Sequence, residues 1–321
     1  MAITLAEAQK NVQDALQMGV IDEFRKNNYL LDNLTFDDAV SPTGGGATMT
    51  YAYTRLITQP TADFRAVNSE YAAQEVTKDR YTTDLKIFGG AFTIDRVISD
   101  MGGIVREVAF QMEQKIKAAK SLFNDTVING DQAVNANAFD GLEKALVGAS
   151  TEMNGATGDT AIDLSNSAAV TKNYTAFLDV LDEFLHTLDG TPTALLCNTK
   201  LAAKLRACAR RASMYQSTPN SFGEQVERYG NIPFVDLGAK AGSNTDVIAT
   251  DATTGATSLY AVRFGLDGFH GVSMASQSPI RTWMPDFSTA GAVKKGEVEM
   301  VAAVALKATK AAAVLRKIKV V

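Results

Sequence analysis

Apolar residues recur at helical spacing in two long segments of the first half of the chain. In residues 4–27 and 104–128 they step by three or four positions, and charged residues fill the gaps between them. The first segment predicts an N-terminal helix, and the second a spine-like helix about 37 Å long at 1.5 Å per residue. We expect the second helix to end at Asn129 and Gly130, with the glycine in the left-handed conformation and Asp131 in the following turn.

A polar segment between these helices shows the two-residue alternation of strands. Tyr51, Tyr53 and Arg55 stand at every second position on the way out, and Tyr81 and Leu85 fall on the same alternation on the way back. Two such runs around a polar middle predict a long β-hairpin. Isolated hairpins are marginally stable in water, so we favour a projecting arm that meets other subunits over a simple solvated hairpin. The charged positions expected at that subunit interface are Arg55, Asp63, Arg65, Glu70, Lys78 and Arg80.

Consecutive glycines lie near both ends of the predicted hairpin. Gly44, Gly45 and Gly46 precede it, and Gly89 and Gly90 follow it. Glycine runs favour neither helix nor strand, because glycine loses the most conformational freedom on folding. We interpret both groups as hinges at the two bases of the hairpin.

The second half of the chain alternates between helical and strand-like segments. A loop-rich stretch, residues 142–170, separates it from the first half. Helices are predicted in YTAFLDVLDEFLHTL and KLAAKLRACARRA, with strands in TALLCN, IPFVDL, TDVIAT and SLYAVRF. This order predicts a mixed α/β core, and the last segment, from residue 296, reads as two strands joined by a bend.

Composition and charge narrow the possible functions. Hydrophobic residues make up 46% and charged residues 21%, which is ordinary for a globular protein, and no apolar run is long enough for a membrane span. The formal charge of −5 argues against a dedicated basic face for nucleic acid, although weak contact stays compatible with it. Cys197 and Cys208 are expected to be reduced thiols.

Several stretches resemble catalytic or metal sites without meeting their requirements. The stretch FNDTVINGDQAVNANAFDGL fails as a calcium loop, because Val127 and Ala136 stand where carboxylates are needed. No Gly-Lys-Ser/Thr follows the glycine run, and the two histidines, His186 and His270, lack zinc-ligand spacing. We therefore expect no catalytic, cofactor or metal site and no enzyme. A metal-dependent hydrolase and a self-associating tail or decoration protein are the alternatives from other classes.

The order of these segments resembles the major capsid proteins of tailed bacteriophages, the Hong Kong 97-like capsid family. TQPTADFRAVN (58–68) is similar to the family's extended loop, and REVAFQMEQKIKAAKSLFNDTVINGD (106–131) with FDGL (139–142) to its spine helix and the turn after it. TPTALLCNTKLAAKLRACAR (191–210) and RYGNIPFVDLG (228–238) resemble segments of its axial domain. VAAVALKATKAAAVLRKIKV resembles the closing strand pair of its peripheral domain. Each of these strings alone is weak evidence for the family, and the resemblance rests on their order along the chain.

The resemblance implies an α+β, Hong Kong 97-like capsid fold with five segments. They are an N-terminal arm (1–43), an extended β-hairpin loop (44–92), a peripheral domain with the spine helix (93–150), an axial α/β domain (151–290) and the closing strands of the peripheral domain (291–321). It also implies that Asn129, Gly130 and Asp131 end the spine helix and redirect the chain.

The function implied by the resemblance is structural. The chain would self-assemble into pentamers and hexamers of an icosahedral shell around double-stranded phage DNA. Its partners would be other copies of itself, a separate scaffolding protein, a portal protein, possible decoration proteins and weakly contacted DNA, with no membrane. It would be located in the virion after assembly in the host bacterial cytoplasm. The alternative within this fold is an encapsulin-type compartment that holds enzyme cargo.

Overall fold

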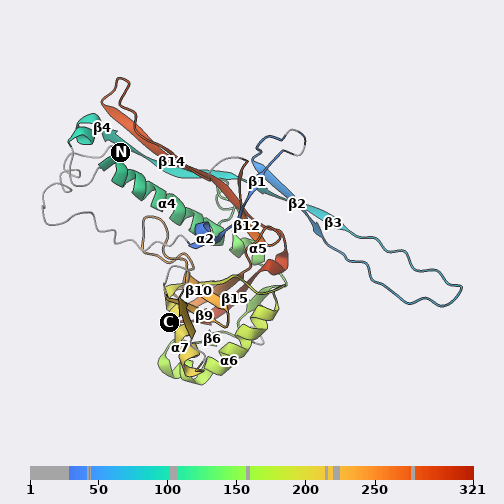
Figure 1. Ribbon diagram of the computed structural model, residues 1–321. Coiled ribbons are helices and arrows are strands. Elements are labelled where there is room, and N and C mark those ends of the chain that lie inside the picture. The colour runs from blue at the N-terminus through green and yellow to red at the C-terminus, as the bar shows by residue number, and fades with distance from the viewer. Residues whose placement is uncertain are drawn as a thin grey trace.

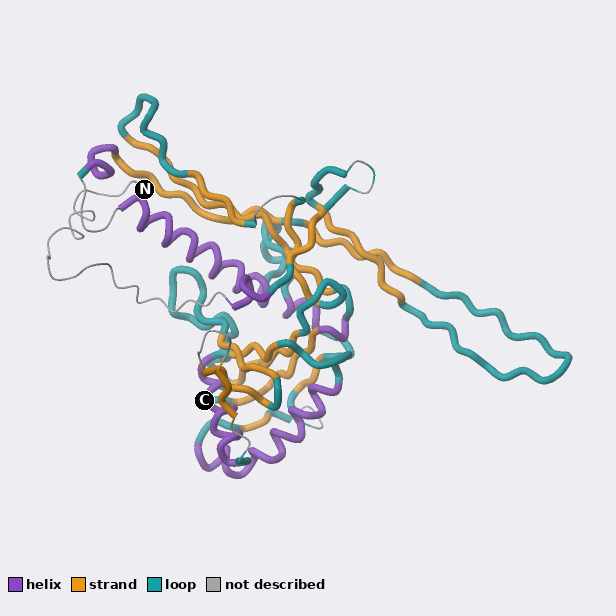
Figure 2. Tube along the Cα trace, viewed as in Figure 1, coloured by secondary structure: helices purple, strands orange, loops and turns teal. Residues whose placement is uncertain are grey.

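The computed structural model describes residues 29–41, 43, 45–101, 107–156, 160–213, 216–219, 225–275 and 279–321. Two β-sheets form the body, and a long two-stranded arm projects from it (Figures 1 and 2). The predicted N-terminal helix over residues 4–27, and most of the segment 1–43, lie outside the described residues. The mixed α+β fold agrees with the class expected from the sequence.

The first sheet has five strands and is covered on one face by a long helix. Its order is β1 (Phe36–Ala39), β12 (Phe269–Met274), β14 (Val293–Leu306) and β13 (Ile280–Trp283), and β4 (Lys86–Asp95) also pairs with β14. The long helix, α4 (Glu107–Asn129), runs beneath β4 and β14 (Figure 1). Phe92, Ile94 and Val298 pack on Met112 and Ala119 of α4.

The alternation of β14 explains which face of this sheet is covered. Gly296, Val298 and Met300 are buried, while the residues between them, Glu297 and Glu299, are partly exposed. Beyond Met300 every residue of the strand is buried, because the base of the arm packs on the outer face there. Val301 and Ala305 form that second contact together with Leu85.

The second sheet has eight strands and a hydrophobic layer on each face. Its main order is β5 (Glu152–Asn154), β15 (Ala312–Lys319), β11 (Ala256–Val262), β7 (Ala194–Cys197), β10 (Ile232–Asp236), β9 (Gln225–Tyr229) and β8 (Gln216–Pro219), and β6 (Ile162–Asp163) pairs with β15. Helices α6 (Ser167–His186) and α7 (Thr199–Arg211) cover one face. The other face joins α4 and α5 (Leu142–Leu146) in the core that connects the two sheets.

The placement of the last strands differs from the sequence-based expectation. The two closing strands were expected together in the peripheral domain, but only β14 lies in the five-stranded sheet. β15 crosses into the eight-stranded sheet, where it pairs with β11 and β5. Conversely, β12 and β13, from the region expected to be axial, lie in the five-stranded sheet. Local strand patterns do not encode the sheet that a strand joins.

A second correction concerns residues 245–250, the segment TDVIAT. Its apolar residues predicted a strand, but it forms only an isolated bridge between Ala239 and Asp246. Val247 and Ile248 are nevertheless buried in the core between the sheets. The apolar residues of this segment therefore predicted its burial correctly, but the predicted strand is wrong.

The end of α4 lies where the sequence predicted it, at Asn129. The predicted left-handed glycine is wrong, because Gly130 is not among the residues with a positive φ. Glycine is required there for space instead: a Cβ would lie 2.2 Å from the Phe139 carbonyl oxygen and 2.5 Å from that of Thr126. The Gly141 amide donates to the Gly130 carbonyl oxygen over 2.8 Å, so the chain returns directly against the helix end.

Candidate functional site

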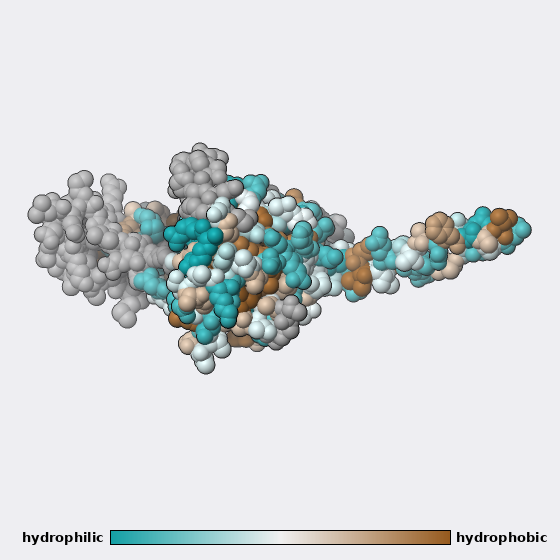
Figure 3. Space-filling view, turned by 90° about the horizontal axis from the view of Figure 1, so that it is seen from below, coloured by the Kyte–Doolittle hydropathy of each residue, from teal (hydrophilic) through white to brown (hydrophobic). Residues whose placement is uncertain are grey.

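The arm is the feature that distinguishes this molecule from a compact globular domain. Strands β2 (Thr50–Leu56) and β3 (Lys78–Asp84) pair antiparallel, with Tyr53 opposite Tyr81, and carry the outer residues 57–77 far from the body (Figures 1 and 2). Figure 3 shows the arm as a thin projection on which apolar and polar residues alternate. The predicted long hairpin is present, although its regular pairing covers only the inner part.

The base of the arm is fixed to the five-stranded sheet, and we call this contact the arm root: Asp37, Tyr51, Tyr53, Arg55, Tyr81, Leu85, His270 and residues 306–307. The Tyr53 hydroxyl donates to the Leu306 carbonyl oxygen over 3.0 Å, and Arg55 Nε donates to that of Lys307 over 2.8 Å. The Arg55 guanidinium lies 4.3 Å from the centre of the Tyr81 ring. These bonds use backbone carbonyl groups at the end of β14, so they hold the arm against the body.

The outer part of the arm is held together by polar contacts between its two sides. The Ile57 amide donates to the Thr77 carbonyl oxygen over 2.9 Å, and the Thr61 amide donates to Gln74 Oε1 over 2.7 Å. We call residues 61–74 the arm tip. There Arg65 Nη1 donates to the Ser69 carbonyl oxygen over 3.1 Å, and the guanidinium lies 5.4 Å from the Tyr71 ring centre.

The arm tip presents large apolar side chains to solvent. Phe64 is 103% exposed, Val67 88% and Tyr71 64%. Single exposed apolar residues are normal, but three within eight positions at the end of a projection form a hydrophobic surface without a core behind it. Figure 3 shows brown, hydrophobic residues near the far end of the arm. The arrangement is suited to burial against another molecule.

The six charged residues predicted at a subunit interface separate into two groups. Arg55 is committed to the arm root of its own chain. The other five lie along the exposed outer side of the arm and its tip; they are Asp63, Arg65, Glu70, Lys78 and Arg80. The sequence could not make this distinction, because the partner of Arg55 is a carbonyl group 252 positions away.

The two glycine groups predicted as hinges lie in different kinds of structure. Gly45 and Gly46 belong to a tight turn closed by the bond from the Ser41 amide to the Gly46 carbonyl oxygen, 2.7 Å, while Gly44 lies outside the described residues. Their role as a hinge stays a prediction. Gly89 and Gly90 are not at a base of the hairpin: they lie inside β4 and pair with Glu299 and Val298.

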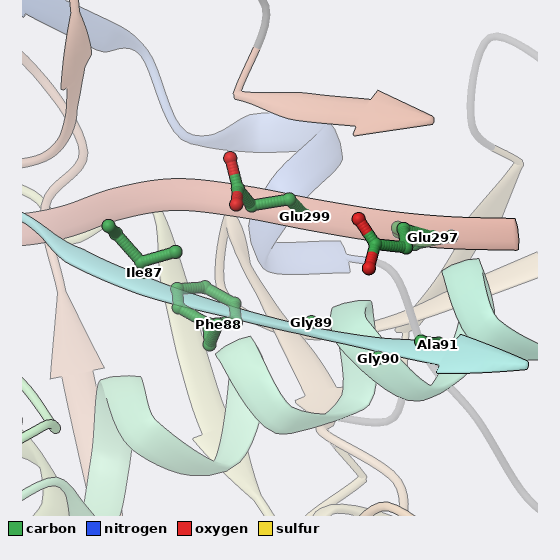
Figure 4. Close-up of a pocket in the computed structure, with 8 residues that line it drawn as sticks. Ile87, Phe88, Gly89, Gly90, Ala91, Glu297 and Glu299 are labelled. Atoms are coloured by element: carbon green, nitrogen blue, oxygen red, sulfur yellow. The ribbon is translucent and has the colours of Figure 1, made fainter. Parts of the chain in front are cut away.

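The backbones of β4 and β14 approach each other so closely at Gly89 that only glycine fits there. A Cβ there would lie 2.0 Å from the Val298 carbonyl oxygen. The surface above forms a shallow pocket of about 290 Å³ between β4 and β14. In Figure 4, Glu297 and Glu299 point away from α4 on this surface, whereas Phe88 lies on the side of the helix. Its lining consists of two carboxylates, Glu297 and Glu299, and otherwise glycine and apolar residues, so it contains neither a catalytic nucleophile nor a histidine or lysine base.

The described residues contain no group of three or more His, Cys, Asp or Glu that could hold a metal ion. The two cysteines are buried and free; burial raises the pKa of Cys197 far above its usual range and that of Cys208 to about 11, so neither is a reactive thiolate.

In the stretch 123–142, Asp131 accepts from Lys144 Nζ over 2.5 Å and from the Ala133 amide over 2.8 Å. Its polar side chains close turns after α4.

Sequence reasoning missed a charged cluster that links α5 to the eight-stranded sheet. Arg316 of β15 donates from Nε to Glu152 and from Nη1 to Glu143, each over 2.5 Å, and the Tyr260 hydroxyl donates to Glu143. The last segment was predicted as two strands joined by a bend, and that pattern does not show that the Arg316 side chain is only 16% exposed. The cluster links α5, β5, β11 and β15, which are far apart in the sequence.

Comparison with known proteins identifies the family. Residues 48–251, more than half of the chain, match the sequence profile described as the SU10 major capsid protein. The chain belongs to the SU10 major capsid protein family. This capsid protein therefore has a structural role in the phage shell. A search of curated proteins finds no match.

Solved structures confirm the Hong Kong 97-like fold of the capsid protein. The SrpI encapsulin from Synechococcus elongatus PCC 7942 has a TM-score of 0.65 at 15% identity, over 100% of this chain and 97% of that chain. The capsid of Myoviridae phage XM1 has a TM-score of 0.59 at 12% identity, over 98% and 99%. A solved chain of Mycobacterium phage Ogopogo has a TM-score of 0.53 at 15% identity, over 98% of this chain and 99% of that chain. Among the described helices of the capsid protein, none has the length and hydrophobicity that crossing a membrane requires.

Proposed function

We propose that this capsid protein assembles into pentamers and hexamers of an icosahedral shell around double-stranded DNA, and that the arm forms contacts between its copies. The single observation that carries the arm's role is its geometry. The arm extends from the body with Phe64, Val67 and Tyr71 exposed at its tip. A closed shell requires each subunit to contact several neighbours, and a projecting arm reaches across such boundaries.

The arm has the properties of an element that is completed by a partner. Its root is fixed by hydrogen bonds to the body, so the tip is presented in a defined direction instead of diffusing freely. Pre-organisation of this kind reduces the entropy lost on binding. Asp63, Arg65 and Glu70 provide charges of both signs around the apolar tip, which suits an interface with an apolar centre and a polar rim. Lys78 and Arg80 continue the exposed charge along β3.

Weak individual contacts are sufficient for such a shell. Each copy makes the same contacts in a closed assembly, so multivalency stabilises the whole even where one interface is weak. A net charge of −5 supports a container wall that contacts packaged DNA weakly and without sequence preference. A scaffolding protein, a portal protein and possible decoration proteins complete the proposed set of partners. The proposal includes no enzymatic activity and places assembly in the bacterial cytoplasm.

Electron microscopy of particles tests the proposal. We would express the full chain alone and with its scaffolding partner, and compare it with a variant in which residues 59–75 are replaced by a short turn. The wild-type chain is expected to form closed icosahedral particles. The shortened variant is expected to remain folded, with an unchanged circular dichroism melt, and to form no closed shells. If the shortened variant formed normal shells, the arm would not be needed for contacts between copies. If the wild type formed only small oligomers in both conditions, the proposed shell-forming function would be wrong.

The likeness to the SrpI encapsulin, over the full length of both chains, supports a second candidate within the same fold. In that case the shell would enclose enzyme cargo. The contents of purified native particles distinguish the two functions: nuclease-protected DNA supports the viral capsid, and a co-purifying enzyme without DNA supports the compartment. The match to a major capsid protein family favours the first.

A further inference from the structure

His270 is a fully buried histidine in the arm root. It lies on β12 opposite Ala305 of β14 and is 0% exposed. The Tyr51 ring of the arm covers it, edge to face, with 5.6 Å between ring centres. Within the part of the chain that the structure describes, neither ring nitrogen makes a hydrogen bond of normal geometry, and the Gly268 backbone is among the groups that act on the ring. Buried polar groups are nearly always satisfied, so this exception requires an explanation.

The charged groups around His270 are already paired with one another. Asp37 of β1 accepts from the Tyr51 hydroxyl over 2.5 Å and lies 3.6 Å from Lys307 Nζ, just beyond β14. Asp267, in the turn before β12, forms an ion pair with Arg263 over 2.8 Å. Each nearby carboxylate therefore has a cationic partner. A proton on His270 would add a positive charge to a fully buried ring without a carboxylate among the described residues that is free to pair with it, which is costly in a medium of low polarity.

The electrostatic balance favours the neutral imidazole at neutral pH. Burial lowers the pKa of His270 below its usual value, and Lys307 acts in the same direction; Asp37, the Gly268 backbone and Asp267 oppose them without reversing the shift. Asp37 itself stays ionised in mild acid. Burial opposes its ionisation, but the Tyr51 hydroxyl, the Asp38 amide and Lys307 outweigh burial and lower the pKa of its carboxyl.

We propose that His270 is a proton-operated latch: in mild acid its imidazole gains a proton, the Tyr51 contact opens to admit water, and the arm is released from its fixed direction. The position supports this because Tyr51 is the arm residue that covers the ring. Opening the arm root exposes only a small apolar cluster, whereas solvating His270 from any other side would disrupt the sheet. The ligand of this site is a proton alone.

The direction of the pH effect follows from linkage. Because the folded state lowers the pKa of His270, the closed root is fully favoured above the unperturbed value of about 6.5 and loses stability as the pH falls from there towards the folded-state pKa. Opening that begins just below pH 6.5 precedes the titration of ordinary carboxylates, near pH 4, and therefore points to a histidine.

Amide hydrogen exchange by mass spectrometry tests the latch on the full-length protein. Protection factors, corrected for the pH dependence of intrinsic exchange, would be compared at pH 7.5 and 5.0 for residues 50–56 and 78–84. In the wild type we expect protection to be lower at pH 5.0 than at pH 7.5, because protonation of the imidazole favours the open root. His270→Phe keeps a buried neutral ring and should remove this pH dependence. His186→Gln, at the only other histidine of the chain, is the matched control and should retain it.

A second measurement keeps the proposal falsifiable if His270→Phe does not fold. Exchange of the imidazole C2 proton reports the titration of each histidine in the wild-type protein. The proposal requires His270 to titrate below about pH 6.5 and in step with the loss of arm-root protection. It is overturned if the root stays protected when His270 is charged, or if a folded His270→Phe opens in acid like the wild type. Both readouts are local, so they stand independently of whether the protein builds a DNA-filled shell.

Discussion

Two long antiparallel strand pairs in this protein show how differently similar local patterns can be used. β4 pairs with β14 over ten positions, and β2 pairs with β3 over seven. Helix α4 covers the first pair and buries Phe92, Ile94 and Val298. The second pair projects into solvent, and in the part of the chain described no helix covers it (Figure 1). Because α4 covers β4 and β14, that pair is part of the core. β2 and β3 have no such cover among the described residues, so the arm depends for its stability on the arm root and on contacts with partners.

The difference has an energetic consequence. A pair covered by a helix gains stability from apolar area removed from water, at about 25 cal/mol per Å². The arm gains little in this way, so its own cohesion rests on hydrogen bonds and on the arm root. Changes in the covered pair should therefore alter folding, and changes in the outer arm should alter assembly.

The largest effect on stability is expected from Phe123→Ala in α4. Phe123 is 0% exposed and stacks with Phe88 of β4, with 6.3 Å between ring centres. Loss of the ring should lower the free energy of unfolding by about 3–5 kcal/mol, measured by chemical denaturation. Phe64→Ala at the arm tip is the matched control and should leave unfolding unchanged while it weakens particle formation. Equal destabilisation by both variants would remove the distinction between the two pairs.

A smaller effect is expected from Gly89→Ala, which tests the close approach of β4 and β14. The added Cβ meets the Val298 carbonyl oxygen, so the strands must separate locally. The expected loss of stability is about 1–3 kcal/mol, typical of overpacking. Gly46→Ala has open space and should change stability by less than about 0.5 kcal/mol. A neutral Gly89→Ala would show that the backbone can shift without cost.

The arm root should show a local effect with little global change. Arg55→Met removes the bond to the Lys307 carbonyl oxygen and the contact with Tyr81. We expect a loss of about 1.5 kcal/mol of protection, read by amide exchange in residues 50–56 and 78–84, with the global melt almost unchanged. Arg80→Met, on the exposed side of β3, is the control. If Arg80→Met loosens the arm to the same extent, the root is not what holds it.

The smallest effect is expected below pH 4, from Asp37. Its carboxyl has a pKa below the usual value because the Tyr51 hydroxyl, the Asp38 amide and Lys307 outweigh burial. Its contribution is therefore fully present above about pH 4 and is lost as the pH falls through the folded-state pKa. Asp37→Asn should flatten the acid dependence of arm-root protection in this range. If protection of the arm root in Asp37→Asn depended on pH between 4 and 2.5 as it does in the wild type, other carboxylates would be responsible for the acid sensitivity.

Local periodicity was sufficient to predict several elements of this protein. The α4 spacing identified the helix and its end at Asn129, and TALLCN and KLAAKLRACARRA became β7 and α7. The alternation of Tyr51, Tyr53 and Tyr81 identified the arm. These signals are local, since side chains on one face of a helix or strand lie within a few positions of one another. The order of the segments was also enough to indicate the capsid family.

Contacts between distant positions decided the rest. Only the tertiary structure places β15 in the eight-stranded sheet, Gly89 against Val298, and Arg55 on a carbonyl group at the far end of the chain. It also brings His270 beneath Tyr51, where the ring is buried and its nitrogens make no hydrogen bond of normal geometry to any described residue. The sequence determined which segments form helices and strands because those preferences arise between neighbours. Pairing, burial and charge compensation depend on which surfaces meet, and only the folded chain decides that.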